Sequence, residues 1–212
     1  MDDLRVKRIA AIRRLGYGSV LILTLGPWGG AASLEPGGTP DGVPPGFSLA
    51  RSGDVHDFDF LRGAWTTRQR RLAQRGVGSA AWQEAPANQH CAAALLDGAA
   101  LIEESRFPDG KPAGLFLYTF NAQKHQWSIF WVNPRTGRPD PGTVGGFEGT
   151  RGEFYGDDED NGRAVKVRVT WTASDRDHAR WEQAFSFDKR TWETNWITDF
   201  TRGDSARLCP KS

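Results

Sequence analysis

The residues that could carry out chemistry are few, and their positions argue against a typical active site. Glu182 and Glu193 fall in consecutive β-like runs and could form a general acid–base pair, and His90 lies in a third such run. Alternation of apolar and polar residues places both glutamates on the solvent side of their strands, where a structural role is the stronger interpretation. The sequence has no Gly-x-Ser-x-Gly motif, phosphate-binding loop or metal-spaced histidine cluster. We therefore expect no metal site and favour a non-enzymatic function, with catalysis by Glu182, Glu193 or His90 as the alternative.

A second group of residues is suited to binding a ligand. The chain contains nine Trp and twelve Phe, and many of them alternate with polar residues along β-like runs. Residues that share the apolar face of a strand are expected to point inward, and polar residues on that face need partners that a ligand or ordered water can supply. The expected ligand-binding residues are Gln69, Arg71, Tyr118, Trp127, Trp131, Trp181, Gln183, Trp192, Thr194 and Trp196. The alternative is a filled interior in which the tryptophans are only core residues.

The elements that must position these residues are β-strands. The clearest strands are expected at residues 65–72, 99–106, 115–120, 126–132, 164–171, 180–187 and 192–200. Turn sequences such as Asn161-Gly162 separate them, and no stretch shows sustained helical spacing of apolar residues. A meander of this kind can close on itself and so remove its exposed edges. The sequence therefore predicts an all-β fold: a single antiparallel up-and-down β-barrel of about ten strands.

Composition narrows the range of partners. The chain has 27 Lys and Arg against 26 Asp and Glu, for a formal net charge of +1. No overall field would attract nucleic acid or an anionic membrane. The expected partner is a small hydrophobic molecule, and nucleic acid is not expected.

The N-terminal segment differs from the rest of the chain. Basic residues between positions 7 and 14 precede an apolar run at 15–25 and small residues at 29–33, which is the order found in signal peptides. The run is too short to span a bilayer comfortably, so we expect a signal peptide at residues 1–32 and no stable membrane insertion after its cleavage. Residues 33–53 are rich in Pro and Gly and are expected to form a linker, followed by the barrel at 54–204 and a tail at 205–212. The predicted location is periplasmic or secreted.

Cys91 and Cys209 are the two cysteines of the chain. In an oxidising compartment an even number favours a disulfide, here between the barrel and the C-terminal tail. Because two cysteines without metal or redox spacing carry little information, an unpaired, buried Cys91 stays open as the alternative.

Several segments resemble a known family. Gly63-x-Trp65 at the opening of the first strand and Arg202 after the last resemble the lipocalin or calycin signature, in which the tryptophan plugs the barrel base and the arginine stacks on it. The ordered segments HDFDFL, QWSIFWVN, GGFEGTRGEFYG, WEQAFS and TWETNW are similar to those of an exported bacterial lipocalin-like family of unknown function. The resemblance covers residues 54–202. It implies the barrel fold and structural roles for Gly63, Trp65 and Arg202, and it leaves the function open.

The same resemblance raises haem as a cofactor, because nitrobindin, another barrel with a Gly-x-Trp start, holds haem through one histidine. An axial ligand must point into a wide apolar pocket, and only His90 of the four histidines falls within a strand. A hydrogen-bonded position in the barrel wall is the stronger interpretation of His90, so we expect no cofactor.

Taken together, these patterns predict an exported lipocalin-like carrier or sensor of a small hydrophobic or aromatic molecule. Two alternatives stay open. One is a cofactor-free isomerase, cyclase or hydrolase with its site in the barrel mouth, and the other is a structural or interaction domain with a filled barrel.

Overall fold

The structure is a computed structural model that describes residues 42–209. The expected signal peptide, residues 1–32, and the first part of the expected linker lie outside these residues. Within the described part of the chain, no helix is long and apolar enough to cross a membrane.

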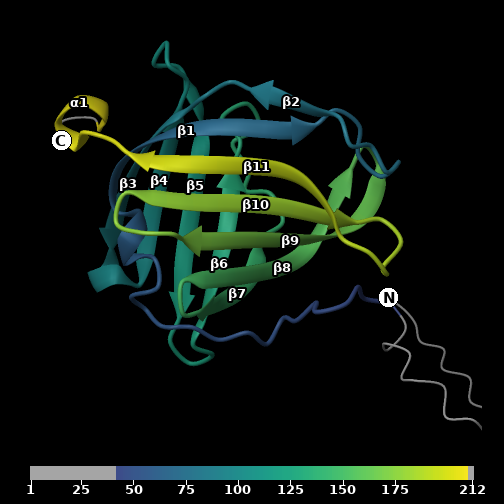
Figure 1. The fold of residues 1–212 in the computed structure, drawn as a ribbon. Helices are drawn as coiled ribbons and strands as arrows, with labels where there is room; N and C mark the ends of the chain where they lie inside the picture. The colour runs from purple at the N-terminus through teal and green to yellow at the C-terminus, as the bar shows by residue number, and fades with distance from the viewer. Residues whose placement is uncertain (1–41, 210–212) are drawn as a thin grey trace, which may run out of the picture. The chain divides into compact units, whose positions relative to one another are not determined.

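Eleven strands form one antiparallel sheet (Figure 1). In chain order they are β1 (Gly63–Leu72), β2 (Trp82–Ala85), β3 (Gln89–Leu95), β4 (Ala100–Arg106), β5 (Pro112–Asn121), β6 (Gln126–Val132), β7 (Thr143–Glu148), β8 (Arg151–Asp160), β9 (Arg163–Ala173), β10 (His178–Ser186) and β11 (Glu193–Arg202). Short 3-10 turns precede β1 (Asp59–Leu61) and β4 (Leu96–Gly98), and helix α1 (Ser205–Leu208) follows β11.

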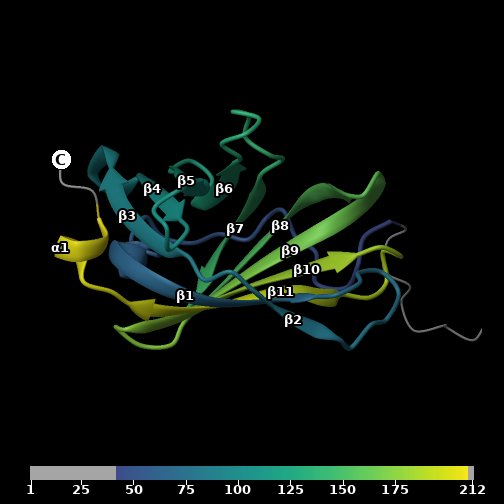
Figure 2. The ribbon, with the colours of Figure 1, turned by 90° about the horizontal axis from the view of Figure 1, so that it is seen from above.

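Strand β1 closes the sheet into a barrel. One of its edges pairs with β11, from Trp65↔Arg202 to Arg71↔Trp196. Its other edge pairs first with β3 and then with β2, so that β2 and β3 share one position and the barrel has ten strand positions. Figure 2 shows β3–β6 on one side and β9–β11 with β1 on the other. The predicted all-β, up-and-down barrel of about ten strands is confirmed.

Alternation along the strands decides which side chains enter the barrel. In β9, Val165, Val167, Val169 and Trp171 are all buried in the core, as expected from the sequence. Val167 pairs with Phe185 of β10, which is also in the core. Burial of these apolar and aromatic side chains is the main driving force for closing the sheet.

Trp65 and Arg202 form the base of the barrel, as the family resemblance implies. Trp65 is fully buried and donates a hydrogen bond from Nε1 to the Leu61 carbonyl at 2.8 Å. The Arg202 guanidinium lies 3.6 Å from the centre of the Trp65 ring. Gly63 has a φ of +98°, a backbone conformation that residues other than glycine rarely adopt. Arg202 also donates to three carbonyl oxygens, those of Arg62 (2.7 Å), Phe60 (2.8 Å) and Arg176 (2.9 Å).

A disulfide ties the C-terminal segment to the barrel wall. Cys91 of β3 is bonded to Cys209, and their Cα atoms are 5.3 Å apart. The Asp204 side chain caps α1 by accepting from the Ala206 N–H, and the Ser205 hydroxyl accepts from the backbone N–H of Ala64. The expected pairing of the two cysteines is therefore confirmed.

Residues 42–53 depart from the expectation of an unpacked linker. The Gln126 amide donates to the carbonyls of Leu49 and Arg51, at 2.8 and 2.9 Å. Phe47 packs against the Tyr155 ring with centroids 5.4 Å apart. Composition alone missed this packing because it depends on backbone carbonyls and on one aromatic side chain whose partners are distant in the sequence.

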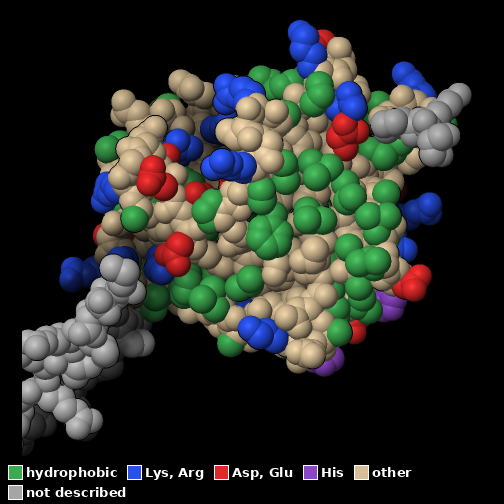
Figure 3. Space-filling model, turned by 180° about the vertical axis from the view of Figure 1, so that it is seen from behind, with side chains coloured by type: hydrophobic (Ala, Val, Ile, Leu, Met, Phe, Trp, Pro, Cys, Tyr) green, Lys and Arg blue, Asp and Glu red, His purple; other side chains and the backbone are tan. Residues whose placement is uncertain are grey.

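The outer surface of β4–β6 is more apolar than simple alternation would suggest. Figure 3 shows hydrophobic side chains gathered at the centre of the face opposite that of Figure 1, with charged side chains nearer its edges. Ile102, Leu115, Leu117 and Phe130 are half-buried there, and they alternate with inward residues. Neighbouring strands bury these side chains against one another.

The base predicts a strong dependence of stability on Trp65 and Arg202. We expect Trp65→Ala to lower the free energy of unfolding by about 3–5 kcal/mol, because it removes a large buried aromatic side chain. Arg202→Ala should cost roughly 2–4 kcal/mol, because three carbonyls lose a charged donor as well as the stacking contact. Urea unfolding would measure both. The control is Arg70→Ala, which removes an arginine stacked on the exposed Trp82, and an Arg202→Ala variant as stable as this control would contradict the assigned role.

The disulfide predicts a second effect on stability. The bond closes a loop with a sequence separation of 118 residues, so replacing both cysteines by alanine should cost about 2–5 kcal/mol. Urea unfolding of the oxidised protein, the reduced protein and the double variant would test this. We expect the reduced protein to behave like the double variant. Equal midpoints for all three would contradict a stabilising bond.

Candidate functional site

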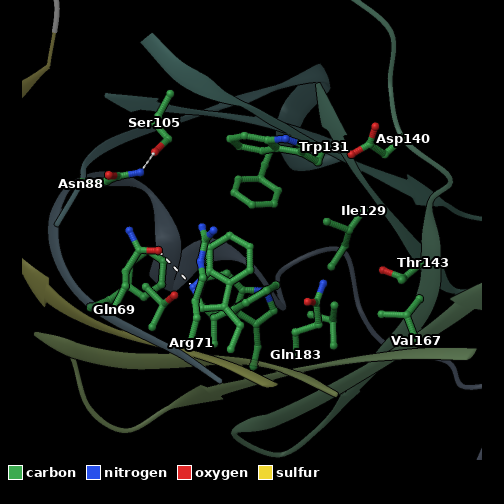
Figure 4. Close-up of a pocket in the computed structure, with 18 of the residues that line it drawn as sticks. Gln69, Arg71, Asn88, Ser105, Ile129, Trp131, Asp140, Thr143, Val167 and Gln183 are labelled. Atoms are coloured by element: carbon green, nitrogen blue, oxygen red, sulfur yellow. Dashed lines mark hydrogen bonds between the residues drawn. The ribbon is translucent and has the colours of Figure 1, made fainter. Parts of the chain in front are cut away.

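The half of the barrel remote from Trp65, called the upper half below, contains a cavity of about 390 Å³ (Figure 4). It lies toward the ends of the strands that are remote from Trp65. Six of the ten residues expected to bind a ligand line it: Gln69, Arg71, Trp131, Trp181, Gln183 and Trp196. Residues that the sequence analysis did not select also line it, among them Asn88, Ser105, Phe107, Phe116, Ile129 and Thr143.

Trp196 is held in a fixed orientation on one wall. Its indole Nε1 donates to Oε1 of Gln69 at 3.1 Å, and the Gln69 amide donates in turn to the Pro86 carbonyl at 3.0 Å. The Arg71 guanidinium stacks 3.5 Å from the centre of the Trp196 ring. Trp181 packs edge to face against Trp196, with the two ring centroids 5.1 Å apart. These contacts build a rigid aromatic surface before any ligand enters.

A second aromatic pair lies across the cavity. Phe116 of β5 and Trp131 of β6 have ring centroids 4.6 Å apart, and Figure 4 shows Trp131 on the opposite side of the cavity from Arg71 and Gln183. Trp171 and Phe200, 5.0 Å apart, also line the cavity and separate it from the core of the base. The space between the two walls therefore suits a flat, apolar molecule.

Two residues expected in the cavity belong to the core instead. Trp127 is fully buried, donates from Nε1 to the Asp54 carbonyl at 2.8 Å and packs against Phe58. Tyr118 is 1% exposed and packs against the same phenylalanine. Both point inward as expected, but they lie deeper than the cavity, because Phe58 enters the barrel from the segment before β1 and fills the space beneath them.

A β-bulge in β11 overturns the expected facing of Thr194 and Glu193, and of Trp192 just before the strand. Gln183 pairs with Trp196 but the next residue, Ala184, pairs with Thr194, so one residue is skipped and the alternation reverses. Thr194 is therefore outside the cavity. Trp192 packs against Tyr155 on the outer surface and donates a hydrogen bond to the Pro45 carbonyl. Glu193, which was expected to face solvent, accepts a hydrogen bond from the backbone N–H of Gly76 at 2.7 Å.

A chain of polar side chains runs through the wall formed by β3, β4 and β5. Glu103 is fully buried, and one of its oxygens lies 2.6 Å from Nδ1 of His90 while the other accepts from the Tyr118 hydroxyl. His90 Nε2 lies 3.3 Å from the Ser105 hydroxyl, which accepts from the Asn88 amide at 2.8 Å. Burial and the negative charge of Glu103 raise the pKa of Tyr118 well above its ordinary value.

This polar chain is arranged as part of the wall. The order serine, histidine and carboxylate resembles a nucleophile relay, but Ser105 is only 1% exposed and its oxygen already contacts Asn88 and His90. Both ring nitrogens of His90 are engaged and His90 does not line the cavity, so it does not fit the role of an axial haem ligand. Glu182 borders a separate hollow outside the barrel cavity. The three residues proposed for catalysis are thus not brought together.

Acidic side chains occupy one part of the cavity mouth. Asp140 and Asp158 both line it, and burial together with the neighbouring acids raises the pKa of Asp158. Among residues 42–209, no group of three or more Asp, Glu, His or Cys side chains is arranged to hold a metal ion. The mouth therefore carries negative charge on the side of β8 and the β6–β7 loop.

The closed strand pairing and the internal cavity define a lipocalin-like antiparallel β-barrel. No family model and no curated protein matches the chain. Two solved structures are similar: a redesigned β-barrel, with 12% identity and a TM-score of 0.38, and Rv2717c from M. tuberculosis, with 13% identity and a TM-score of 0.45. Each comparison covers 72% of this chain and 99% of the other. Similarity at this level supports no statement about function.

The raised pKa of Tyr118 predicts loss of stability at high pH. The unfolded chain releases the tyrosine proton near pH 10, whereas the folded protein retains it, so stability should be unchanged by this group below pH 10 and fall above it. Urea unfolding at pH 8, 10 and 11 should show a smaller loss for Tyr118→Phe than for the unaltered protein. Tyr155→Phe should reduce the loss as well, because burial and Glu153 raise the pKa of that hydroxyl to about 12. If Tyr118→Phe loses as much stability between pH 8 and 11 as the unaltered protein, the raised pKa of Tyr118 is contradicted.

Proposed function

We propose that the protein binds a small, planar, largely apolar molecule in the barrel cavity. The observation that carries this proposal is the pair of aromatic walls facing a cavity of about 390 Å³, a volume within the usual range for small-ligand sites. The Trp196 wall is preorganised by its hydrogen bond to Gln69. Little conformational entropy is then lost when a flat ligand is bound.

The cellular setting of this function is part of the proposal. The N-terminal sequence pattern and the resemblance to exported lipocalin-like proteins support binding outside the cytoplasm, in the periplasm or after secretion. The Cys91–Cys209 disulfide is consistent with an oxidising compartment. The protein would act there as a carrier or sensor.

The same observations favour binding over the two alternatives. A filled barrel is disfavoured by the cavity itself. An enzyme that uses Glu182, Glu193 or His90 is disfavoured because the three side chains lie apart. Glu182 lies outside the barrel cavity, Glu193 accepts a hydrogen bond from the backbone of Gly76, and His90 lies within the barrel wall.

Binding of N-phenyl-1-naphthylamine, an uncharged fluorescent probe, tests the proposal. We expect the probe to gain fluorescence on binding and Trp196→Ala to weaken its affinity about tenfold, because one aromatic wall is lost. Thermal melts would show whether the variant remains folded. The control is Trp82→Ala, which alters an exposed tryptophan outside the cavity. If the probe does not bind the unaltered protein, or if both variants weaken it equally, the cavity is not the binding site.

A further inference from the structure

Arg71 lines the cavity and has no acidic partner among residues 42–209, a property that it shares with Arg70 on the outer surface. Arg68 pairs with Glu84, and Arg75 pairs with Asp160. The Arg71 side chain stacks on Trp196, but among residues 42–209 its guanidinium forms no ion pair and donates no hydrogen bond, whereas Arg68 and Arg75 are paired. The five N–H donors of its guanidinium are thus left for solvent or a ligand.

The surroundings of Arg71 are unfavourable for an uncompensated cation. Burial lowers its pKa, and the positive charge of Arg75 lowers it further. The side chain remains accessible through the mouth, so an incoming molecule can reach it. A cation that is partly removed from water and lies near a second cation gains stability from a negative partner.

Neighbouring strands extend the arrangement into a row. Arg71 pairs across strands with Trp196, and Trp196 pairs with Gln183. All three line the cavity (Figure 4). Gln183 forms no side-chain hydrogen bond within residues 42–209, so its amide can donate to the same ligand group or to an adjacent one.

We propose that the ligand of this cavity is an aromatic carboxylic acid whose carboxylate pairs with Arg71, an inference that rests on the proposed binding function. A carboxylate matches the planar fork of a guanidinium, and two parallel hydrogen bonds can form between them. The aromatic part would lie between the Trp196 wall and the Phe116–Trp131 pair.

The acids at the mouth give the ligand one orientation. Asp140 and Asp158 lie with β8 and the β6–β7 loop, whereas Arg71 extends from β1, and Figure 4 shows Asp140 and Arg71 on different sides of the cavity. A carboxylate placed near the acids would be repelled, and one placed near Arg71 would be attracted. The cavity thus selects a monocarboxylate bound with its charge toward β1.

Calorimetric titration with two probes of equal shape tests this inference. The probes are 2-naphthoate, which is ionised at pH 7.5, and 2-naphthamide, which is neutral. We expect the full chain to bind naphthoate about tenfold more tightly than the amide at low salt, and less selectively at high salt. Arg71→Met should abolish this preference, measured as the ratio of the two affinities, and Arg71→Lys should retain part of it.

A matched control separates a specific pair from general electrostatic attraction. Arg70→Met removes the same charge from the adjacent position, where the side chain lies over Trp82 on the outer surface. The inference is overturned if Arg70→Met reduces the preference as much as Arg71→Met, or if the unaltered protein binds both probes equally. In the second case binding of the amide still supports the proposed function. If neither probe binds, the proposed function itself fails.

Discussion

The stacking of Arg202 on Trp65 is the contact on which closure of the barrel depends. The two residues are cross-strand partners at the first register position between β1 and β11, so the contact fixes how the last strand meets the first. The same guanidinium binds three carbonyls from the turns beside it. Once this end is sealed, the aromatic core can fill only the lower half, and the upper half remains free to form a cavity.

The buried polar chain in β3–β5 constrains the opposite wall. A carboxylate as fully enclosed as that of Glu103 is costly unless both of its oxygens are hydrogen-bonded. His90 and Tyr118 meet this requirement from the two adjacent strands. The register of β3, β4 and β5 is therefore specified by polar geometry as well as by apolar burial, since a shift of one residue would leave these groups unpaired.

Much of the fold could be predicted from the sequence because strand alternation and turn chemistry are local. The faces of residues 164–171 were predicted correctly for this reason. The acidic run at residues 157–160 ends strand β8, where it lies opposite residues 163–166 of β9 and Lys166 forms an ion pair with Asp157. Packing of residues 42–53 and the contacts of Glu103 depend on neighbours distant in sequence, which no local pattern encodes.

The bulge in β11 shows how a single extra residue separates the facing of this strand from that of the residues at and before its start. Before it, Trp192 faces outward and holds the N-terminal segment through the Pro45 carbonyl. After it, Trp196 faces inward and forms the cavity wall. Uninterrupted alternation would have placed both tryptophans on the inward face of the sheet. An irregularity in the ladder, which no propensity signals, thus decides which of the two tryptophans lines the cavity.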